Sequence, residues 1–287
     1  MRLIFNCQPN MSEMNQKSAP MGSGSGLWAI GVRGLLPALL ALSCATAQAA
    51  PEEIQVYMDE FNDPGQLTLD VHTNYVPTAQ PGSPTRRQFQ ATPEWGYGIN
   101  PHWEAGLYLL SGSSPEISSG HPVVNGAKLR FKWRPWIPAE TDAWRFALNW
   151  EVGHLAQRFN PDESSTQLKI IEAYRQGPWL GALNLNINGS LHQHPSEPSS
   201  IELDGKMTYQ ISSKEKGEWR IGLERYDVMG ALHPNINQPS PHSTSNFLVA
   251  DFSVGDWDFD VGIGRAYGSA YANTDKTVLK VIIGVPI

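Results

Sequence analysis

A unit that starts with a tryptophan recurs five times and constrains the fold of this chain more than any other feature. In each copy a short turn precedes the tryptophan, and apolar residues then alternate with small or charged ones. The tryptophans are Trp103, Trp144, Trp179, Trp219 and Trp257, at spacings of 41, 35, 40 and 38 residues. Because successive side chains of a strand point to opposite faces, the alternation predicts β-strands with one apolar face. A period of this length indicates a repeated structural unit.

Two architectures have such a period. A β-propeller blade has four short strands in about 40 residues and often carries a Trp-Asp signature, which Trp257 and Asp258 match. A membrane β-barrel hairpin has two strands of about ten residues each, a short turn and a long loop in the same length. After each tryptophan the alternation continues for about ten residues without a turn signal. This length predicts two strands per repeat and favours the barrel.

The pattern predicts an all-β fold, a transmembrane up-and-down antiparallel barrel of about 12 strands. Their expected ranges are 67–76, 87–99, 103–111, 124–136, 143–154, 165–175, 179–189, 200–212, 219–228, 245–254, 257–267 and 275–285. Short turns follow the even-numbered strands, and longer polar loops follow the odd-numbered ones. Short periplasmic turns and long extracellular loops are typical of outer-membrane barrels. An even strand count then places both ends of the barrel in the periplasm.

The N-terminal region has the features of an export signal. Arg33 provides a positive flank, residues 35–42 an apolar core, and residues 47–49 an Ala-x-Ala cleavage site. Acylation at Cys44 is a weaker alternative, because the residues before it fit a lipobox poorly. Both cysteines, Cys7 and Cys44, precede the cleavage site. The exported chain is therefore expected to contain no disulfide and no cysteine-bound metal.

These signals divide the chain into three parts. We expect residues 1–49 to be a signal peptide with an upstream extension, residues 50–66 a periplasmic N-terminal helix and linker, and residues 67–287 the outer-membrane barrel. The helix is expected over 51–63, which starts with a proline and two glutamates and ends at Asp-Pro-Gly. Its apolar stripe consists of Ile54, Tyr57, Met58 and Phe61. We expect it to rest against the rim of the barrel rather than to act as a plug.

Composition excludes two classes of protein. The net charge is −7, and it becomes −9 when the signal is removed, since 21 − 3 basic and 28 − 1 acidic residues remain. Phosphate binding needs concentrated positive charge, so nucleic acid is not an expected partner. No stretch of 18 apolar residues is present, and the mean hydropathy is −0.34. A helical membrane protein is therefore excluded, whereas a barrel, which is apolar on one strand face only, is not.

The polar strand faces carry many charged residues. In a soluble β-sandwich these faces would meet water, whereas in a membrane barrel they line the lumen. The lumen-lining and solute-binding candidates are Asp70, His72, Glu94, Glu104, Lys128, Arg130, Lys132, Glu151, Asp204, Lys206, Glu224, Asp258 and Asp260. Two interpretations stay open. The favoured one is that these charges pair across the lumen and hold its shape. In the other, Lys128, Arg130 and Lys132 form a basic constriction that selects anionic or polar solutes.

The five tryptophans also predict a depth in the membrane. Each starts a strand directly after a short turn, so each would lie at the inner boundary between membrane and water. Indole favours that depth because its ring is apolar and its N–H needs a polar partner. We therefore expect Trp103, Trp144, Trp179, Trp219 and Trp257 to form an interfacial girdle.

No residue pattern in the chain makes a convincing catalytic or metal site. Some outer-membrane barrels are lipid hydrolases that use a serine and a nearby histidine. The only local candidates are Ser243 and Ser245 beside His242, and their spacing matches no hydrolase motif. Four loop histidines, His121, His192, His194 and His233, are weak metal candidates. We expect no catalytic residue, no metal and no cofactor.

Four stretches resemble a known group of proteins. They are residues 53–60, 69–75, 92–99 and 103–106, and the third contains Thr-Pro-Glu followed by Gly-Tyr-Gly. These stretches resemble an uncharacterised family of proteobacterial outer-membrane barrels and are similar to the barrels associated with phenol-degradation pathways. The resemblance implies export and a barrel, and it implies no particular substrate. The chain departs from many such barrels because its sequence ends in Ile287 rather than in an aromatic residue.

Three hypotheses for function follow. The leading one is a narrow channel or transport barrel for small solutes in the outer membrane of a Gram-negative bacterium. The alternative is a closed structural or surface-interaction barrel whose loops bind an external partner. A lipid hydrolase of the outer membrane is less favoured. The expected partners are outer-membrane lipid, the barrel assembly machinery and a small-molecule solute.

Overall fold

A computed structural model describes residues 53–79, 85–156, 163–191, 199–212, 217–232, 242–268 and 276–287. The signal expected over residues 1–49 lies outside these ranges. The strands are β1 (Leu67–Ala79), β2 (Phe89–Asn100), β3 (Trp103–Ser113), β4 (Val123–Trp133), β5 (Trp144–Leu155), β6 (Ser164–Gln176), β7 (Trp179–Ser190), β8 (Ser200–Gln210), β9 (Trp219–Ala231), β10 (Ser243–Val254), β11 (Trp257–Gly268) and β12 (Lys276–Val285), with a one-turn helix α2 (Pro115–Ser118) after β3. Among the described residues no helix is long and apolar enough to span a membrane.

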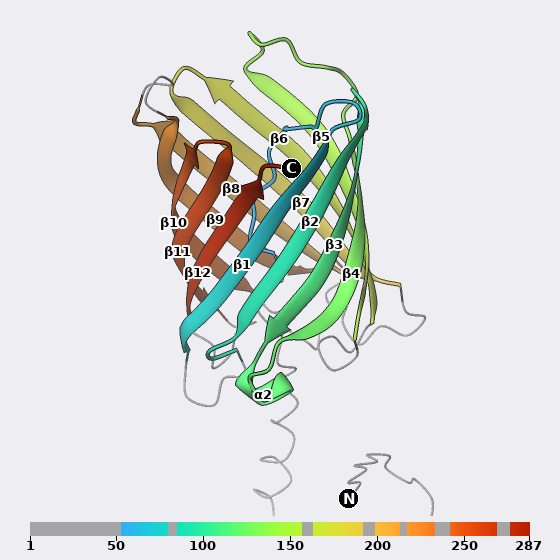
Figure 1. The fold of residues 1–287 in the computed structure, drawn as a ribbon, viewed down its shortest axis with the longest axis vertical. Coiled ribbons are helices and arrows are strands. Elements are labelled where there is room, and N and C mark those ends of the chain that lie inside the picture. The colour runs from blue at the N-terminus through green and yellow to red at the C-terminus, as the bar shows by residue number, and fades with distance from the viewer. Residues whose placement is uncertain are drawn as a thin grey trace, which may run out of the picture. The chain divides into compact units, whose positions relative to one another are not determined.

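The strands form a closed antiparallel barrel (Figure 1). Each strand pairs with its neighbours in the sequence, and β1 pairs with β12, with Leu69 opposite Val285 and Tyr75 opposite Leu279. Closure leaves no unpaired sheet edge, which an open sheet of this length would expose to another chain. All twelve predicted strands are confirmed. The ends differ by a few residues, as at β1, which ends at 79 rather than 76.

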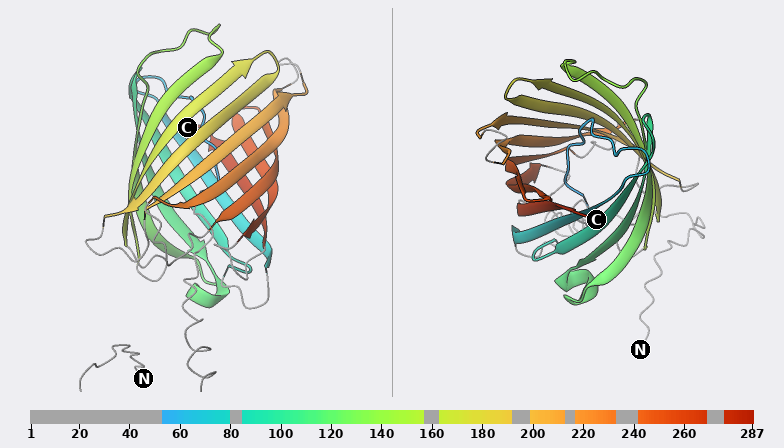
Figure 2. Two further views of the ribbon diagram at one scale, coloured as in Figure 1. Left: turned by 180° about the vertical axis from the view of Figure 1, so that it is seen from behind. Right: turned by 45° about the horizontal axis from the view of Figure 1, so that its top comes forward.

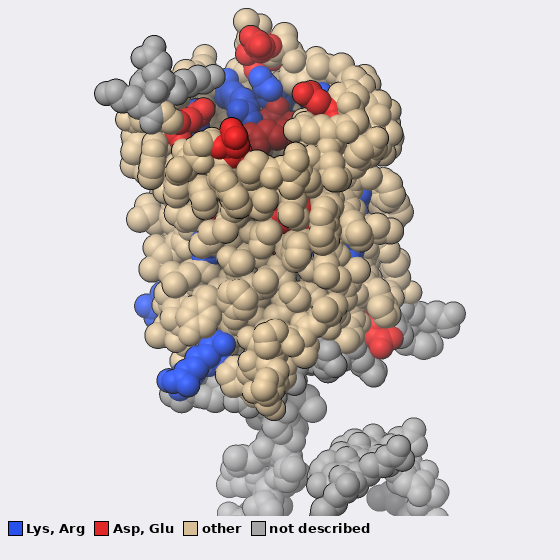
Figure 3. All heavy atoms as spheres, viewed as in Figure 1, with Lys and Arg blue, Asp and Glu red and all other residues tan. Residues whose placement is uncertain are grey.

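The outer wall of the barrel is apolar. Leucines in the middle of the strands are exposed there, including Leu223 (64%) and Leu248 (61%), which are paired across β9 and β10. Acidic and basic side chains gather instead in the hollow at one end of the barrel, and few reach the outer surface (Figure 3). A soluble protein would bury these leucines and expose the charges. Here the leucines are exposed and the charges are enclosed, as the alternation of apolar and polar residues predicts for a barrel in lipid.

The five repeated tryptophans start five alternate strands at the short-turn end. All five are exposed on the outer wall, where four of them contact an aromatic residue of the neighbouring strand; the Trp103 and Trp133 ring centroids are 6.1 Å apart. The ring centroids are 4.8 Å apart in Trp144–Tyr174, 4.9 Å in Trp179–Tyr209 and 4.3 Å in Trp219–Phe252. This end of the barrel therefore has an aromatic belt on its outside. That the belt lies at a membrane interface stays a prediction.

The N-terminal segment, residues 53–66, is not the predicted helix. Its residues have no helical hydrogen bonds, and it runs as an irregular chain inside the barrel, where Figure 2 shows it crossing the lumen. Val56 and Tyr57 are 2% and 3% exposed although they are adjacent in sequence. A helix resting on a rim would bury one stripe only. The lumen surrounds the segment on all sides, and wall side chains replace the hydrogen bonds of a helix.

This segment also explains two strands whose inward face is hard to assign from sequence. In β6, Ile171 and Ala173 point inward and pack against Tyr57 and Val56 respectively, and in β10 Phe247 packs in a cluster with Ile54. The inward face is apolar there because it contacts the segment rather than water. The register of β6 is continuous on both sides of Glu172. Glu172 faces outward and is exposed because its neighbours face inward.

Candidate functional site

The lumen holds many of the charged side chains of the barrel, and most of these are arranged in two clusters. The first, the Arg130 cluster, consists of Arg130, Glu94, Glu104 and His72 from β1 to β4. The Arg130 guanidinium lies 2.8 Å from Glu94 Oε1 and 2.6 Å from Glu104 Oε1, and His72 Nε2 is 3.0 Å from Glu94 Oε2. All four side chains are buried. Register explains the set, since Glu104 is paired with Lys132 and Gly106 with Arg130, where a larger residue would collide with the guanidinium.

The second, the Lys206–Lys280 cluster, consists of Lys206, Lys280, Glu224, Asp251 and Asp260 from β8 to β12. Lys206 Nζ is 2.8 Å from Asp251, 2.9 Å from Asp260 and 3.2 Å from Glu224. Lys280 Nζ is 2.6 Å from Glu224 and 3.2 Å from Asp260. Because each ammonium contacts at least two carboxylates, most of the desolvation cost of burying these charges is offset within the cluster. In both clusters the inward charges thus pair with one another along neighbouring strands. That this pairing holds the shape of the lumen stays a prediction.

Asp59 fixes the N-terminal segment to the wall by ion pairs. Its carboxylate is buried and lies 3.0 Å from Arg145 of β5 and 3.3 Å from Arg175 of β6. The next residue, Glu60, reaches Arg175 at 2.8 Å with a side chain that is 72% exposed, and its carbonyl accepts a hydrogen bond from Lys132. Buried charge-assisted contacts are stronger than exposed ones. Asp59 is therefore the principal ionic anchor among the described contacts of the segment.

Tyr57 anchors the segment through neutral hydrogen bonds. Its backbone N–H donates to Asn184 Oδ1 at 2.6 Å, and the Asn184 amide donates back to the Tyr57 carbonyl at 2.9 Å. Its hydroxyl is 2.5 Å from that of Tyr108, and Lys169 Nζ lies 3.7 Å from its ring centroid. A side chain of the wall thus satisfies backbone groups that a buried, non-helical chain would otherwise leave unpaired.

Nearly all of the thirteen predicted lumen residues point inward. Buried there are His72, Glu94, Glu104, Arg130, Lys132, Glu151, Asp204, Lys206 and Glu224, while Asp70, Lys128 and Asp260 are half-buried. Asp258 is exposed at the short-turn end, where its carboxylate accepts a hydrogen bond from Ser253. The basic row is not a free constriction: Arg130 is neutralised by two glutamates, Lys132 contacts the segment, and Lys128 lies 4.0 Å from Glu151. Whether these residues bind a solute stays a prediction.

Several important residues were not among these candidates. Tyr57, Asp59, Arg145 and Asn184 make contacts that join the segment to the wall, and Lys280 pairs with Glu224 and Asp260 in the second cluster. A signal existed for Lys280, which with Lys276 is one of two charges on the inward parity of an otherwise largely apolar strand. No sequence signal marked Asp59, because its partners lie on β5 and β6, which are distant in the sequence.

The weak catalytic and metal candidates have the following positions. Ser243 is buried and Ser245 half-buried at the long-loop end of β10, and His242 is exposed beside them. His121 is exposed in the loop after α2. His192, His194 and His233 lie outside the described residues.

Comparison with known proteins gives structural neighbours only. No protein-family model and no curated protein matches the chain. An outer membrane channel from Pseudomonas putida F1 is similar over 81% of this chain and 99% of its own, at 13% identity and a TM-score of 0.52. The NanC porin (76% and 100% coverage, 12% identity, TM-score 0.51) and the KdgM porin (77% and 99%, 8%, 0.50) are also similar. At these identities the likeness shows that the chain has the β-barrel fold of these proteins.

Proposed function

We propose that this protein is an outer-membrane channel for small solutes, closed in the described conformation by its N-terminal segment. The observation that carries the proposal is the inverted distribution of side chains, with leucines exposed around a closed barrel and ionised groups inside it. A closed barrel satisfies every strand hydrogen bond internally, which a lipid environment requires. The fold shared with two porins and an outer membrane channel supports the same conclusion.

Liposome swelling with a panel of sugars, amino acids and aromatic acids tests the proposal. Aromatic acids belong in the panel because of the resemblance to barrels associated with phenol degradation. Swelling with at least one solute, above the rate of empty liposomes, is the expected result. The proposal would be overturned if both the intact chain and a chain without its N-terminal segment gave no swelling and no ion conductance.

The charge of Lys128 gives a test of ion selectivity. Its ammonium lies 4.0 Å from Glu151 and is 15% exposed, so it is among the less buried cations of the lumen. Lys128→Glu places a second carboxylate beside Glu151, which should favour cations. We expect the ratio of cation to anion permeability to rise severalfold, measured as the reversal potential in a salt gradient. Lys128→Gln should give a smaller shift of the same sign, and an unchanged reversal potential in both would contradict a conducting lumen at this position.

The outer wall gives a test of the lipid environment. Leu248 lies in the middle of β10 and Val254 at its end, and both point outward. Leu248→Arg should destabilise the barrel in lipid by about 2–4 kcal/mol, whereas Val254→Arg should cost roughly 0–1 kcal/mol, because the penalty depends on depth. Urea unfolding in lipid vesicles measures both. Equal costs at the two positions would show that depth in a membrane plays no part.

A closed structural barrel is the second candidate, favoured by one observation: the described lumen is filled by ion pairs and by the N-terminal segment. In that case the loops would carry the function by binding an external partner. The two candidates differ in a single result, because a structural barrel conducts nothing even after residues 53–62 are removed.

A further inference from the structure

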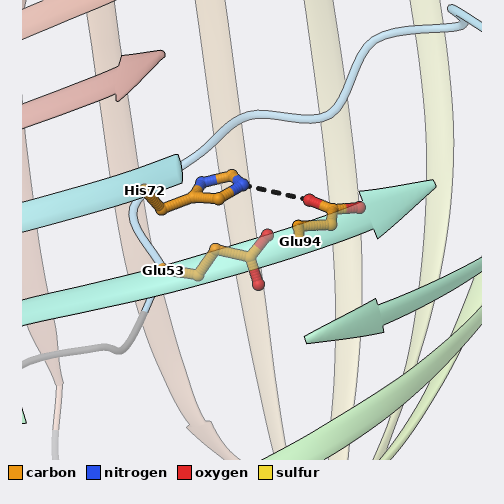
Figure 4. Close-up of side chains that lie close together, drawn as sticks. All are labelled: Glu53, His72 and Glu94. Atoms are coloured by element: carbon orange, nitrogen blue, oxygen red, sulfur yellow. Dashed lines mark hydrogen bonds and ion pairs between the residues drawn. The ribbon is translucent and has the colours of Figure 1, made fainter. Parts of the chain in front are cut away.

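Three side chains of types that can bind a metal ion meet inside the barrel, where the described N-terminal segment begins. They are Glu53 of the segment, His72 of β1 and Glu94 of β2 (Figure 4). One donor atom from each lies within 4.8 Å of the other two, and His72 Nε2 is 3.0 Å from Glu94 Oε2. Both carboxylates lie on the same side of the imidazole as Nε2. His72 is 1% exposed and Glu94 5%, so the donors face one another rather than water.

The charges around these side chains do not balance. Four carboxylates, Glu53, Glu94, Glu104 and Glu151, are connected through Arg130 and the hydroxyl of Tyr57, which lies 2.5 Å from Glu53 and 3.4 Å from Glu151. Two cations, Lys128 and Arg130, face them. Asp70 and Lys132 add one charge of each sign nearby. With His72 neutral, the carboxylates outnumber the cations even when Lys169, whose Nζ lies 3.7 Å from the Tyr57 ring centroid, is counted, and buried charges need compensation.

We propose that Glu53, His72 and Glu94 form a binding site for a divalent metal ion of the Zn²⁺ type. One imidazole nitrogen and two carboxylate oxygens are a donor set that suits Zn²⁺ better than Ca²⁺, which prefers oxygen ligands only. The positive charge of the ion offsets the excess of carboxylates. Roughly 3.3 Å separates donor atoms around tetrahedral zinc with bonds near 2.1 Å. The Glu53 side chain must move inward to reach that spacing, and it belongs to an irregular segment rather than to a strand.

The ion would connect two parts of the protein. Glu53 comes from the segment, whereas His72 and Glu94 come from the wall. A metal ion bound there would tie the start of the segment to β1 and β2. Six residues later, Asp59 holds the segment to β5 and β6. The site does not depend on the channel proposal, because a barrel without transport activity could bind the ion equally well.

Zinc binding to the purified mature chain in detergent tests the site. The protein carries no histidine tag and is first stripped with chelator; bound zinc is then counted per chain, and affinity is measured against a chromophoric chelator. We expect one Zn²⁺ per chain and a rise in the thermal unfolding temperature, because the ion binds only the folded site. Glu53→Gln and His72→Gln should each weaken zinc binding at least about tenfold, because loss of a group that only hydrogen-bonds to a metal ligand already has an effect of that size. Ca²⁺ should bind more weakly than Zn²⁺.

Asp251→Asn is the matched control, because it removes a lumen carboxylate from the other cluster and should leave zinc affinity unchanged. Glu53→Gln keeps the test decisive if other variants fail to fold, since residue 53 lies outside every strand. No stoichiometric zinc in the wild-type chain would overturn the proposal. Equal affinity in wild type and Glu53→Gln would do the same, and would place any bound zinc elsewhere. So would tighter binding of Ca²⁺ than of Zn²⁺.

Discussion

Removal of residues 53–62 should raise the ion conductance of the barrel roughly tenfold, because the segment occupies a lumen that twelve strands keep narrow. The segment is held by Asp59 and by Tyr57 rather than by strand pairing. Its removal therefore leaves the hydrogen-bonded wall intact, since the ladders run from β1 to β12 without it. Single-channel recording in a planar bilayer measures the change.

Two single substitutions separate occlusion from a general effect of altering the N-terminal segment. Asp59→Asn weakens the pairs with Arg145 and Arg175 and should give frequent openings to the higher conductance level. Glu60→Gln alters the adjacent carboxylate, which is largely exposed, and should leave the recording unchanged. A folded barrel that lacks residues 53–62 and conducts no better than the intact chain would show that the segment does not close the pathway.

Arg130→Met should lower the free energy of unfolding by about 3–5 kcal/mol, because it leaves buried carboxylates without their cation. Arg130 is 5% exposed and bridges Glu94 and Glu104, which are 5% and 3% exposed. Methionine fills much of the same volume, so the loss measures charge more than packing. Urea unfolding of the detergent-solubilised protein gives the value.

The matched control for this substitution is Arg225→Met on β9. Arg225 forms an ion pair with Asp227 at 2.5 Å, but its side chain is 57% exposed, so its loss should be small. A double variant, Arg130→Met with Glu104→Gln, should recover part of the stability because it removes one unpaired charge. If Arg130→Met were no more harmful than Arg225→Met, the lumen would be too well hydrated for its ion pairs to matter.

The barrel could be predicted from the sequence because its determinants are local. Alternation with period two assigns each strand residue to a face, and the tryptophans and turns mark where strands start. Leu129 could thus be placed outside, and Glu94, Arg130 and Glu224 inside, without knowledge of their partners. Neighbouring strands in sequence also pair in space, so the register follows from short turns.

The N-terminal segment could not be predicted in the same way. Its apolar residues have helical spacing, yet the adjacent Val56 and Tyr57 are both buried, Val56 against β6 and β7 and Tyr57 against β5 and β6. The partners of Asp59 are 86 and 116 residues away, and those of Tyr57 reach 127. Tertiary contacts of this kind override helical propensity. The inward apolar residues Ile171 and Phe247 were the available sign that something other than water faces them.

The direction of the two faces is the claim on which the account rests, and environment-sensitive labels at single cysteines test it most directly. Once residues 1–49 are removed, the chain has no cysteine of its own. Labels at Leu223 and Leu248 on the outer wall should be quenched by a quencher dissolved in the lipid and protected from one dissolved in water. A label at Asp258, exposed at the short-turn end, should show the opposite pattern. Quenching of the Leu223 and Leu248 labels from water alone would contradict the account.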